Sequence, residues 1–454
     1  MANSRSRLSP DLSGPIAAAL AAHCTDGSRL LLGYSGGLDS TALLHGLALL
    51  RAQHGWQLEC AHVHHGLSPN ADRWADFCAA QCRVLDLPLS VLRVEVSRVS
   101  PDGLECAARD ARYAALHAHA RDRGLDTLLT AHHADDQAET LLHNMVRGAG
   151  LLGLAGMPAW RAADAEHVAT LRPLLGVPRS ALEAHAQAHG LNWIDDESNA
   201  DTRYARNYLR RDVLPVLAAR WPRAPEAMAG VARRLAEAQT LLDELAARDA
   251  EAIAEAAQWG RCYRLDGLIA LDAARQRNLL RWLLRQHGAR TLPNESWLDE
   301  WRRQLAAAQA TSACPMAHAG VAGISHRGAL WLMPDFDPPA EQRWSGEPMQ
   351  VWGAGQIRFE PVSGQGLSGS VVAQACVTVR ARAPGDRLPR GPGRPRAGVK
   401  QIAQECGLPP WLRDRVPIVC IDGHPAWMPG CDIAPPFVAA ADEAGWLPRW
   451  YPAG

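Results

Sequence analysis

Short apolar runs alternate with amphipathic segments through the first half of the chain, up to about residue 215. The runs have the length of strands, and the amphipathic segments carry apolar residues at the three-to-four spacing of helices. The expected strands are residues 29–34, 57–63, 89–96, 126–131 and 168–175. The expected helices are residues 41–52, 71–85, 104–120, 135–146 and 179–189. Because such alternation builds parallel sheets, the pattern predicts an α/β fold with a doubly wound parallel sheet.

The pattern changes in the second half of the chain. Residues 223–310 are dominated by Ala, Leu, Arg and Glu, which is typical of a small helical domain. After Pro334 the chain is rich in Pro, Gly and Trp, with short β-like runs such as 371–380, while 384–398 has the composition of a loop. We therefore expect an α/β domain at 1–216, a helical domain at 217–335 and a small mixed α/β domain at 345–454.

The composition adds little to this division but excludes some classes of protein. Hydrophobic residues make up 47% and charged residues 21% of the chain, and the formal net charge is −1. No apolar run reaches the roughly 18–20 residues of a membrane span, and the N-terminus lacks the core of a signal peptide, so we expect a cytoplasmic protein. The 11 cysteines include no C-x-x-C pair. We expect them to be buried apolar side chains, not a disulfide framework or a metal cluster.

The sharpest motif is S-G-G-L-D-S at residues 35–40, between the first expected strand and the first expected helix. Glycines let successive N–H groups turn toward one anion, and the following helix N-terminus favours negative charge. The motif lacks the G-K-[ST] of a Walker A loop. It resembles the pyrophosphate loop of enzymes that split ATP between its α- and β-phosphates. The residues expected to bind ATP are Ser35, Gly36, Gly37, Leu38, Asp39 and Ser40, with Asp39 also a candidate magnesium ligand.

A second block, T-A-H-H-A-D-D-Q-A-E-T at residues 130–140, follows the fourth expected strand and so opens on the same sheet edge. Asp135 and Asp136 suit a helix N-terminus, and capping alone could account for them. Capping does not account for Glu139, which shares a helix face with Asp136 and could receive an amino group with it. His132 and His133 are candidates for contact with phosphate or for accepting a proton.

The helix before this block carries Glu105, Arg109 and Arg112 on one face, at spacings of four and three. A solvated stripe of ion pairs is one interpretation of this face. The other is an arginine whose planar fork orients a carboxylate. A carboxylate pair with an arginine is what the binding of a free amino acid requires.

Read in order, these motifs resemble the tRNA(Ile)-lysidine synthase family over nearly the whole chain. Matching segments outside the two blocks are H-V-H-H-G-L at 62–67, E-C-A-A-R-D-A-R-Y at 105–113, R-G-A-G at 147–150, R-P-L-L at 172–175, D-E-S-N at 196–199, R-N at 206–207 with Arg210, and P-P-W-L-R at 409–413. The resemblance implies a PP-loop ATP pyrophosphatase domain of Rossmann-like fold, followed by two tRNA-binding domains.

The resemblance also implies an ATP-dependent ligase. In this family the enzyme adenylates C2 of the wobble cytidine in the CAU anticodon of tRNA(Ile) and releases pyrophosphate. Free lysine then attacks through its ε-amine, AMP leaves, and the resulting lysidine changes codon and aminoacylation identity from Met to Ile. ATP and Mg²⁺ are the implied cofactors, and the oligomeric state stays open, a homodimer being one option.

The family's roles carry over to individual residues of this chain. Asp136 and Glu139 would receive an amino group of lysine, and Arg112 would help to place the substrate. His133, with Asp39 and magnesium, would handle phosphate charge, which completes the expected catalytic set. The further residues expected to bind substrate are Arg109, Arg147, Arg206 and Asn207.

The C-terminal region is locally basic. Residues 380–415 carry nine basic and three acidic side chains, although the net charge of the whole chain is −1. Lys400 is the only lysine among the 47 Lys and Arg residues. Contact with RNA phosphates would use this charge, and a solvated loop is the alternative. The residues expected to bind tRNA are Arg382, Arg387, Lys400 and Arg413.

Three other classes of protein share parts of this pattern. A tRNA-thiolating enzyme would carry paired cysteines, and none is evident. An amidotransferase-type synthetase would need a glutaminase domain, and no cysteine nucleophile follows Met1. A non-catalytic RNA-binding relative would not need Asp39, Asp136 and Glu139.

Overall fold

The computed structural model describes residues 11–97, 103–195, 205–308, 314–334, 337–388 and 396–452. The D-E-S-N motif at 196–199 and the basic residues Arg390 and Arg394 lie outside these ranges. The chain forms two compact units, Met1–Leu241 and Leu242–Gly454. Within the described ranges no helix is both long and apolar enough to cross a membrane, and the ten cysteines whose side chains are described are free.

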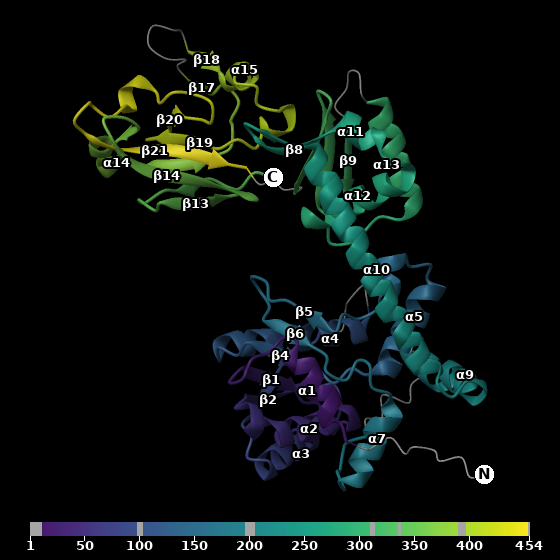
Figure 1. Ribbon diagram of the computed structural model, residues 1–454. Helices are drawn as coiled ribbons and strands as arrows, with labels where there is room; N and C mark the ends of the chain where they lie inside the picture. The colour runs from purple at the N-terminus through teal and green to yellow at the C-terminus, as the bar shows by residue number, and fades with distance from the viewer. Residues whose placement is uncertain are drawn as a thin grey trace. The chain divides into compact units, whose positions relative to one another are not determined.

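A six-stranded sheet forms the centre of the first unit (Figure 1). All neighbouring strands are parallel except the last pair, so the predicted parallel sheet is confirmed. The antiparallel edge strand is only two residues long and was not predicted. In spatial order the strands are β3 (Leu89–Arg93), β2 (Gln57–His64), β1 (Arg29–Gly33), β4 (Thr127–Leu129), β6 (Ala169–Leu171) and β5 (Trp160–Arg161).

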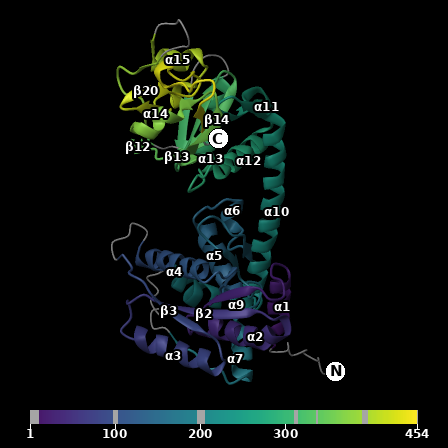
Figure 2. The same ribbon diagram turned by 90° about the vertical axis from the view of Figure 1, so that its left-hand side faces the viewer.

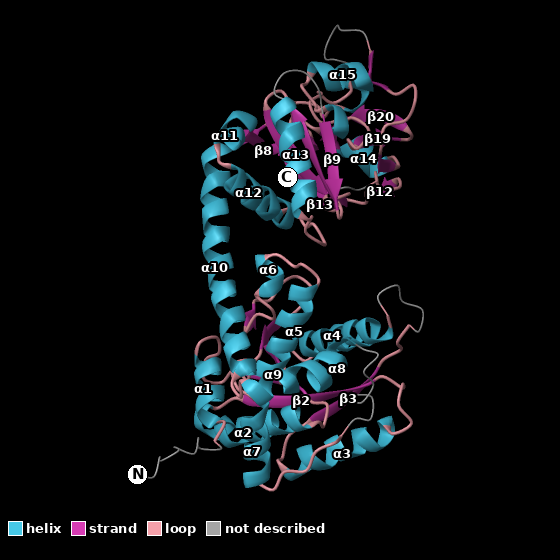
Figure 3. Cartoon of the chain, turned by 90° about the vertical axis from the view of Figure 1, so that its right-hand side faces the viewer, coloured by secondary structure: helices cyan, strands magenta, loops and turns pink. Residues whose placement is uncertain are grey.

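Helices cover both faces of this sheet, because its central strands are apolar on both sides (Figures 2 and 3). Leu30 and Leu32 of β1 pack into one core with residues from four helices, whereas Leu31 packs into a second core with α4. The helices of the first core are α1 (Ser13–Ala21), α2 (Leu38–His54), α3 (Ala71–Val84) and α7 (Arg179–Ala188); the second is covered by α4 (Leu104–Asp122). The alternation along each strand thus produces the doubly wound arrangement.

A smaller cluster joins the helix after β4 to the segment that follows residue 204. Ala138 and Leu142 of α5 (Ala134–Val146) pack against Leu209 and Leu214. The segment runs as α8 (Ala205–Tyr208), a π-helical turn (Leu209–Val213) and α9 (Leu214–Arg220), and the short α6 (Leu151–Leu154) also contacts α5. This packing brings a late part of the domain next to the D-D-Q-x-E block.

The second unit contains the expected helices and also a sheet that the sequence did not indicate. Its helices are α11 (Leu265–Ala270), α12 (Ala273–Gln286), α13 (Glu295–Ala307) and the end of α10 (Ala224–Ile253). The antiparallel strands are β7 (Ala254–Ala257), β8 (Gly260–Arg264), β11 (Ala329–Pro334), β10 (Val321–His326) and β9 (Cys314–His318), in spatial order. Leu283, Trp301 and Leu330 belong to the core that joins these helices to the sheet.

The C-terminal part adds two four-stranded antiparallel sheets around one core, which fits the expected mixed α/β domain. One sheet has the order β12 (Gln342–Arg343), β16 (Val377–Arg380), β19 (Ile418–Ile421), β20 (His424–Trp427); the other has β13 (Met349–Trp352), β14 (Gly355–Ser363), β21 (Ala444–Tyr451), β15 (Leu367–Ser368). Beside them lie α14 (Gly369–Gln374), the pair β17 (Arg387–Leu388) and β18 (Ala397–Gly398), α15 (Val399–Glu405), and short 3₁₀ turns at Pro410–Leu412 and Pro435–Phe437.

One expected β-run is partly wrong. Residues 371–374 of the predicted strand 371–380 belong to α14, and only Val377–Arg380 is a strand. The reason is a helix cap, because the Ser368 hydroxyl accepts a hydrogen bond from the N–H of Val371 at 3.2 Å.

The turn between β1 and α2 depends on one glycine. Gly36 has a φ of +83°, and a Cβ there would lie 2.5 Å from Ile194 Cδ1 and 2.9 Å from Cys78 Sγ. Its carbonyl accepts a hydrogen bond from the N–H of Ile194 at 2.9 Å. Gly37 has an ordinary φ of −72°, and its nearest neighbour would be Ser35 Oγ at 3.5 Å.

We therefore expect Gly36→Ala to lower the free energy of unfolding by about 2 kcal/mol or more, because a left-handed backbone and a close contact act together. The matched variant Gly37→Ala should lower it by no more than about 1 kcal/mol, the cost of Ala at the N-cap of α2. Urea unfolding of the nucleotide-free protein measures both values. Equal losses of stability in the two variants would contradict this explanation of the turn.

Candidate active site

A cavity of about 770 Å³ opens at the carboxyl ends of β1, β2 and β4. That edge is where open α/β sheets bind ligands, and the volume lies in the range of small-molecule sites. The cavity is lined by the phosphate loop, the H-V-H-H-G-L segment, one face of α4, the end of β4, α5 and the segment at 206–210. Motifs separated by up to about 170 positions in the sequence therefore meet around one space.

The phosphate loop presents hydroxyl and amide groups to this cavity. Ser35 Oγ lies 3.0 Å from Ser40 Oγ, and the Ser40 hydroxyl donates to the carbonyl of Gly37 at 3.0 Å. The Gly37 N–H points to Ser35 Oγ at 3.3 Å. No side chain caps the N-terminus of α2, which starts at Leu38, so the positive end of that helix is available to an anion.

A fully buried histidine lies among three carboxylates beside this loop. The ring nitrogens of His133 approach Asp136 at 3.4 Å, Asp39 at 3.5 Å and Asp135 at 3.6 Å. These distances are longer than a normal hydrogen bond, so the attraction is mainly between charges. The backbone N–H of His133 donates a hydrogen bond to Asp136 Oδ2 at 3.0 Å, at the start of α5.

The electrostatics of this group favour its charged forms. Burial opposes the charge on His133, but contacts with Asp135 and Asp39 and the charge of Asp136 raise the pKa of the imidazole to about 10. Burial also works against the Asp39 carboxylate, yet His133, Arg179 and Arg210 hold its pKa below the usual value. His133 is therefore an imidazolium at neutral pH and cannot accept a proton there.

The acidic pair predicted to receive an amino group is already in contact with a guanidinium. Arg210 donates from Nε to Glu139 Oε1 at 2.6 Å and from Nη2 to Glu139 Oε2 at 3.1 Å and to Asp136 Oδ1 at 2.9 Å. Asp136 Oδ2 accepts from His133. All four carboxylate oxygens thus have a partner within the chain. Burial raises the pKa of Glu139, and the charge of Arg210 opposes that rise.

Three other arginines of the cavity carry positive charge that forms no ion pair with a described acid. Arg109 and Arg112 of α4, together with Arg206, line the cavity, and none of them forms an ion pair within the described ranges. The guanidinium carbons of Arg109 and Arg112 lie 5.5 and 5.6 Å from the ring centroid of Tyr113. The solvated ion-pair stripe with Glu105 is therefore not formed, and the surface suits a polyanion.

Most of the predicted site residues meet at this cavity, but a few do not. Those that line it are Ser35, Gly37, Asp39, Ser40, Arg109, Arg112, Asp136, Glu139, Arg206 and Asn207. Three predicted residues are buried next to lining residues without lining the cavity themselves: Gly36, Leu38 and His133. Arg147 does not line the cavity either and is exposed at the C-terminal end of α5. Arg210 also lines the cavity, and the motif that contains it predicts no role for it.

Asp39 fits the magnesium ligand expected at the phosphate loop. Its Oδ1 atom is buried and has no hydrogen-bond partner within the described ranges, although Arg179 lies 3.6 Å away. A carboxylate oxygen beside a phosphate-binding loop is the type of donor that Mg²⁺ takes.

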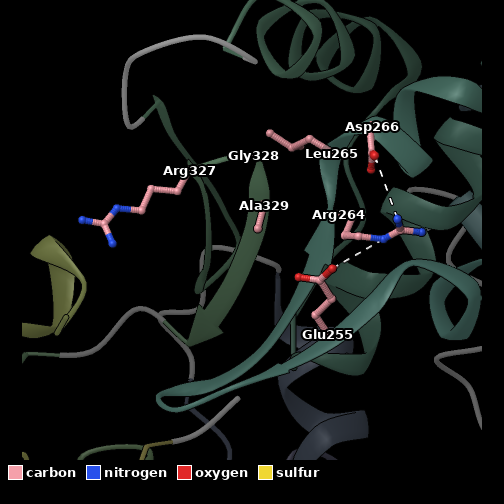
Figure 4. A pocket seen from close by; sticks show the side chains of 7 residues that line it. All are labelled: Glu255, Arg264, Leu265, Asp266, Arg327, Gly328 and Ala329. Carbon is pink, nitrogen blue, oxygen red and sulfur yellow. Dashed lines mark ion pairs between the residues drawn. The ribbon is translucent and has the colours of Figure 1, made fainter. Parts of the chain in front are cut away.

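A second pocket, in the other unit, has less chemistry to offer. It measures about 380 Å³ and lies beside β8 and the turn before β11 (Figure 4). Arg264 pairs there with Glu255 at 3.6 Å and Asp266 at 3.9 Å, while Figure 4 shows the Arg327 side chain pointing away from them. Arg264 thus already pairs with both acids of this pocket, whereas the first cavity is lined by the phosphate loop. The first cavity is therefore the candidate active site.

The basic C-terminal surface is partly neutralised. Arg382 pairs with Asp414, and Arg380 pairs with Asp386 at 2.8 Å. Arg387 and Lys400 are exposed, and Arg413 donates to the carbonyl of Leu408 at 3.1 Å. These last three form no ion pair with a described carboxylate, so their charge is less compensated than that of Arg382.

Family models match three parts of the chain. A PP-loop domain matches residues 13–217, a TilS substrate binding domain matches residues 263–331, and a TilS substrate C-terminal domain matches residues 377–450. The first match contains every residue of the cavity. The match to a PP-loop domain agrees with the phosphate-loop geometry and indicates the use of ATP.

Full-length relatives extend the similarity to the whole chain. The tRNA(Ile)-lysidine synthase of Aromatoleum aromaticum is 45% identical over 93% of this chain and 97% of its own length. The enzymes of the same name from an Azoarcus species and from Nitrosomonas europaea are 42% and 36% identical, over 98% and 100% of this chain and 96% and 98% of their own.

A solved structure is similar at a lower level. The U34-tRNA thiolase NcsA of Methanococcus maripaludis, solved with its [4Fe-4S] cluster, gives a TM-score of 0.44 at 17% identity, over 50% of this chain and 78% of that one.

The buried imidazolium gives a prediction about stability and pH. A pKa raised to about 10 means that the contribution of His133 is complete below the unfolded value near 6.5 and is lost as pH rises toward 10. Without magnesium, the free energy of unfolding should therefore fall between pH 7 and pH 10, and His133→Asn should remove much of that fall.

Urea unfolding at several pH values in the presence of EDTA measures the difference between wild type and variant. His424→Asn, an exposed histidine of the other unit, is the control and should leave the slope unchanged. An identical dependence on pH in the wild type and in His133→Asn would show that the imidazole is not held as a cation.

Proposed function

The chain belongs to the tRNA(Ile)-lysidine synthase family, and from this membership we propose that it ligates free lysine to C2 of the wobble cytidine in the CAU anticodon of tRNA(Ile). The observation that carries the proposal is the shared cavity. A phosphate loop and the acidic pair Asp136 and Glu139 open into the same space, so an activated base and an amine can meet there.

In the first step the phosphate loop holds the leaving pyrophosphate of ATP. Ser35, Ser40 and the N-terminus of α2 supply the donors, and Asp39 would hold the magnesium ion that neutralises phosphate charge. The C2 oxygen of cytidine attacks the α-phosphorus, the bond to the β-phosphate oxygen breaks, and C2 is left bearing an adenylate as leaving group. Arg109, Arg112 and Arg206 lie where they can balance the negative charge.

In the second step lysine attacks the activated base. The acidic pair binds one ammonium group of lysine through charge-assisted hydrogen bonds, and the ε-amine reacts in its neutral form. A bond forms between that nitrogen and C2, the nitrogen gives up a proton, and AMP departs with the original oxygen. No protein nucleophile is needed, because positioning and charge balance suffice for a base that is already activated.

The RNA is the larger partner and needs surface outside the cavity. Exposed Arg387 and Lys400, with Arg413, offer cations to the phosphates of the tRNA. Apolar and aromatic groups at the cavity, Leu67, Trp74 and Tyr113, offer surface on which an extruded base can stack.

Arg210 orients the carboxylates of Asp136 and Glu139 for the binding of lysine. Without a cation, two close carboxylates in a buried site repel each other, and the pKa of Glu139 is already raised by burial. The Arg210 guanidinium aligns the two carboxylates and opposes the rise in the pKa of Glu139, and the incoming ammonium then shares or takes over the carboxylate oxygens. Arg210 is a positioning residue in this scheme.

The first test is the transfer of radiolabelled lysine to a tRNA(Ile) transcript with a CAU anticodon. Incorporation should require both ATP and magnesium and should disappear when the wobble cytidine is replaced by uridine. The cavity is lined by no described cysteine, so thiolation of the same transcript should not occur. ATP–pyrophosphate exchange with no lysine transfer would retain base adenylation and reject the lysine assignment.

A second test separates the role of Arg210 from general folding. Arg210→Ala should raise the KM for lysine about tenfold or more, because the acidic pair loses its direct hydrogen-bond partner. The Kd of ATP should change less than about threefold, because Asp39 keeps His133 and Arg179 beside it. The KM of the variant should also rise more steeply as the pH falls, since Glu139 then protonates more easily.

Arg220→Ala on the nearby α9 is the matched control, since Arg220 is exposed and does not line the cavity. An unchanged or lower lysine KM in Arg210→Ala would overturn the positioning role. A lower value in particular would mean that the guanidinium competes with lysine.

A further inference from the structure

Three histidines meet on the face of the sheet that is covered by α2 and α7. His45 lies in the middle of α2, and His185 and His189 lie one helical turn apart at the C-terminal end of α7. None of them lines the active-site cavity. Their position is therefore unexplained by the ligase reaction.

The geometry of the three rings is close to that of a metal site. One ring nitrogen of each histidine lies within 4.8 Å of the others, and His45 Nδ1 lies 3.0 Å from His185 Nε2. The ring centroids are 5.1, 4.6 and 4.5 Å apart. A tetrahedral zinc ion with bonds of about 2.0–2.1 Å separates its nitrogen ligands by about 3.4 Å, so small rotations of the rings would suffice.

The cluster also has the access that a metal requires. Burial lowers the pKa of His45, and the charges of His189 and His185 lower it further. Neutral imidazole is the form that binds metals. His185 is fully buried, His45 is half-buried and His189 is exposed, which leaves a path for an ion to enter.

A hydrogen bond between two rings explains only part of this arrangement. It accounts for His45 and His185, but it does not account for His189, whose ring centroid approaches both other rings within 4.6 Å. A divalent cation would join all three, and the i, i+4 spacing on α7 is one that helical zinc ligands use.

We propose that His45, His185 and His189 form a structural site for a transition metal such as Zn²⁺, which ties α7 to α2. A water molecule would complete a four-coordinate shell. The site does not depend on the proposed function.

The two helices that the ion would join both start at the active site. The α2 helix begins in the phosphate loop, and α7 begins at Arg179, whose guanidinium lies 3.6 Å from Asp39. The N–H of Arg179 also donates to Asp135 Oδ2 at 2.9 Å. A metal between the helices would therefore stabilise the two elements that hold the phosphate loop and contact Asp39 and Asp135.

The test uses the full, untagged chain, stripped of metal with EDTA and then dialysed. Titration with Co²⁺ should give one equivalent of tetrahedral ion with intense visible d–d bands, and Zn²⁺ should displace it. Saturating Zn²⁺ should raise the Tm by about 5 °C, as expected for a ligand that binds only the folded state. Excess Mg²⁺ should not compete, since it prefers oxygen ligands.

His189→Ala is the decisive variant, because this exposed residue can be changed without disturbing a core. It should lose the cobalt bands and the shift in Tm while the metal-free protein keeps the wild-type Tm. His424→Ala, at an exposed position in the other unit, should behave as wild type. Equal binding by wild type and His189→Ala, no binding by wild type, or a sulfur-to-cobalt charge-transfer band would each overturn the proposal.

Discussion

The cluster of charges at the start of α5 is the constraint on which the active site depends. A charge that is withdrawn from water is costly when it is unpaired, so each of these groups requires its neighbours. The buried imidazolium of His133 lies among Asp39, Asp135 and Asp136, and Arg210 pairs with Asp136 and Glu139. Because the phosphate loop supplies Asp39 and a later helix supplies Arg210, the network also joins segments that lie far apart in the chain.

The fold and the location of the site followed from local patterns in the sequence. Leu30, Leu31 and Leu32 are apolar on both sides of their strand, and only a sheet covered on both faces can bury them. Motifs that follow β1 and β4 had to open on one edge of such a sheet. The sequence therefore predicted that Ser35, Asp136 and Glu139 meet at that edge, and all three line the cavity.

Pairwise contacts between distant segments could not be predicted in this way. Nothing in the spacing of Arg210 indicates that it reaches Glu139, 71 positions earlier. Arg382 belongs to a basic stretch, yet Asp414 neutralises it from another part of that stretch. The strand β7 has the sequence AEAA, which favours helix because Ala and Glu are good helix formers. Its pairing with β8 is a tertiary contact that overrides this local preference.

The π-helical turn at Leu209–Val213 has a consequence for how the chain can vary in length. A π-turn is in effect one residue inserted into an α-helix. Deleting a single residue between α8 and α9 would restore regular helix and rotate the preceding residues by about 100° relative to α9. Arg206 and Arg210 could then no longer both line the cavity, so this stretch should accept substitutions far more readily than insertions or deletions.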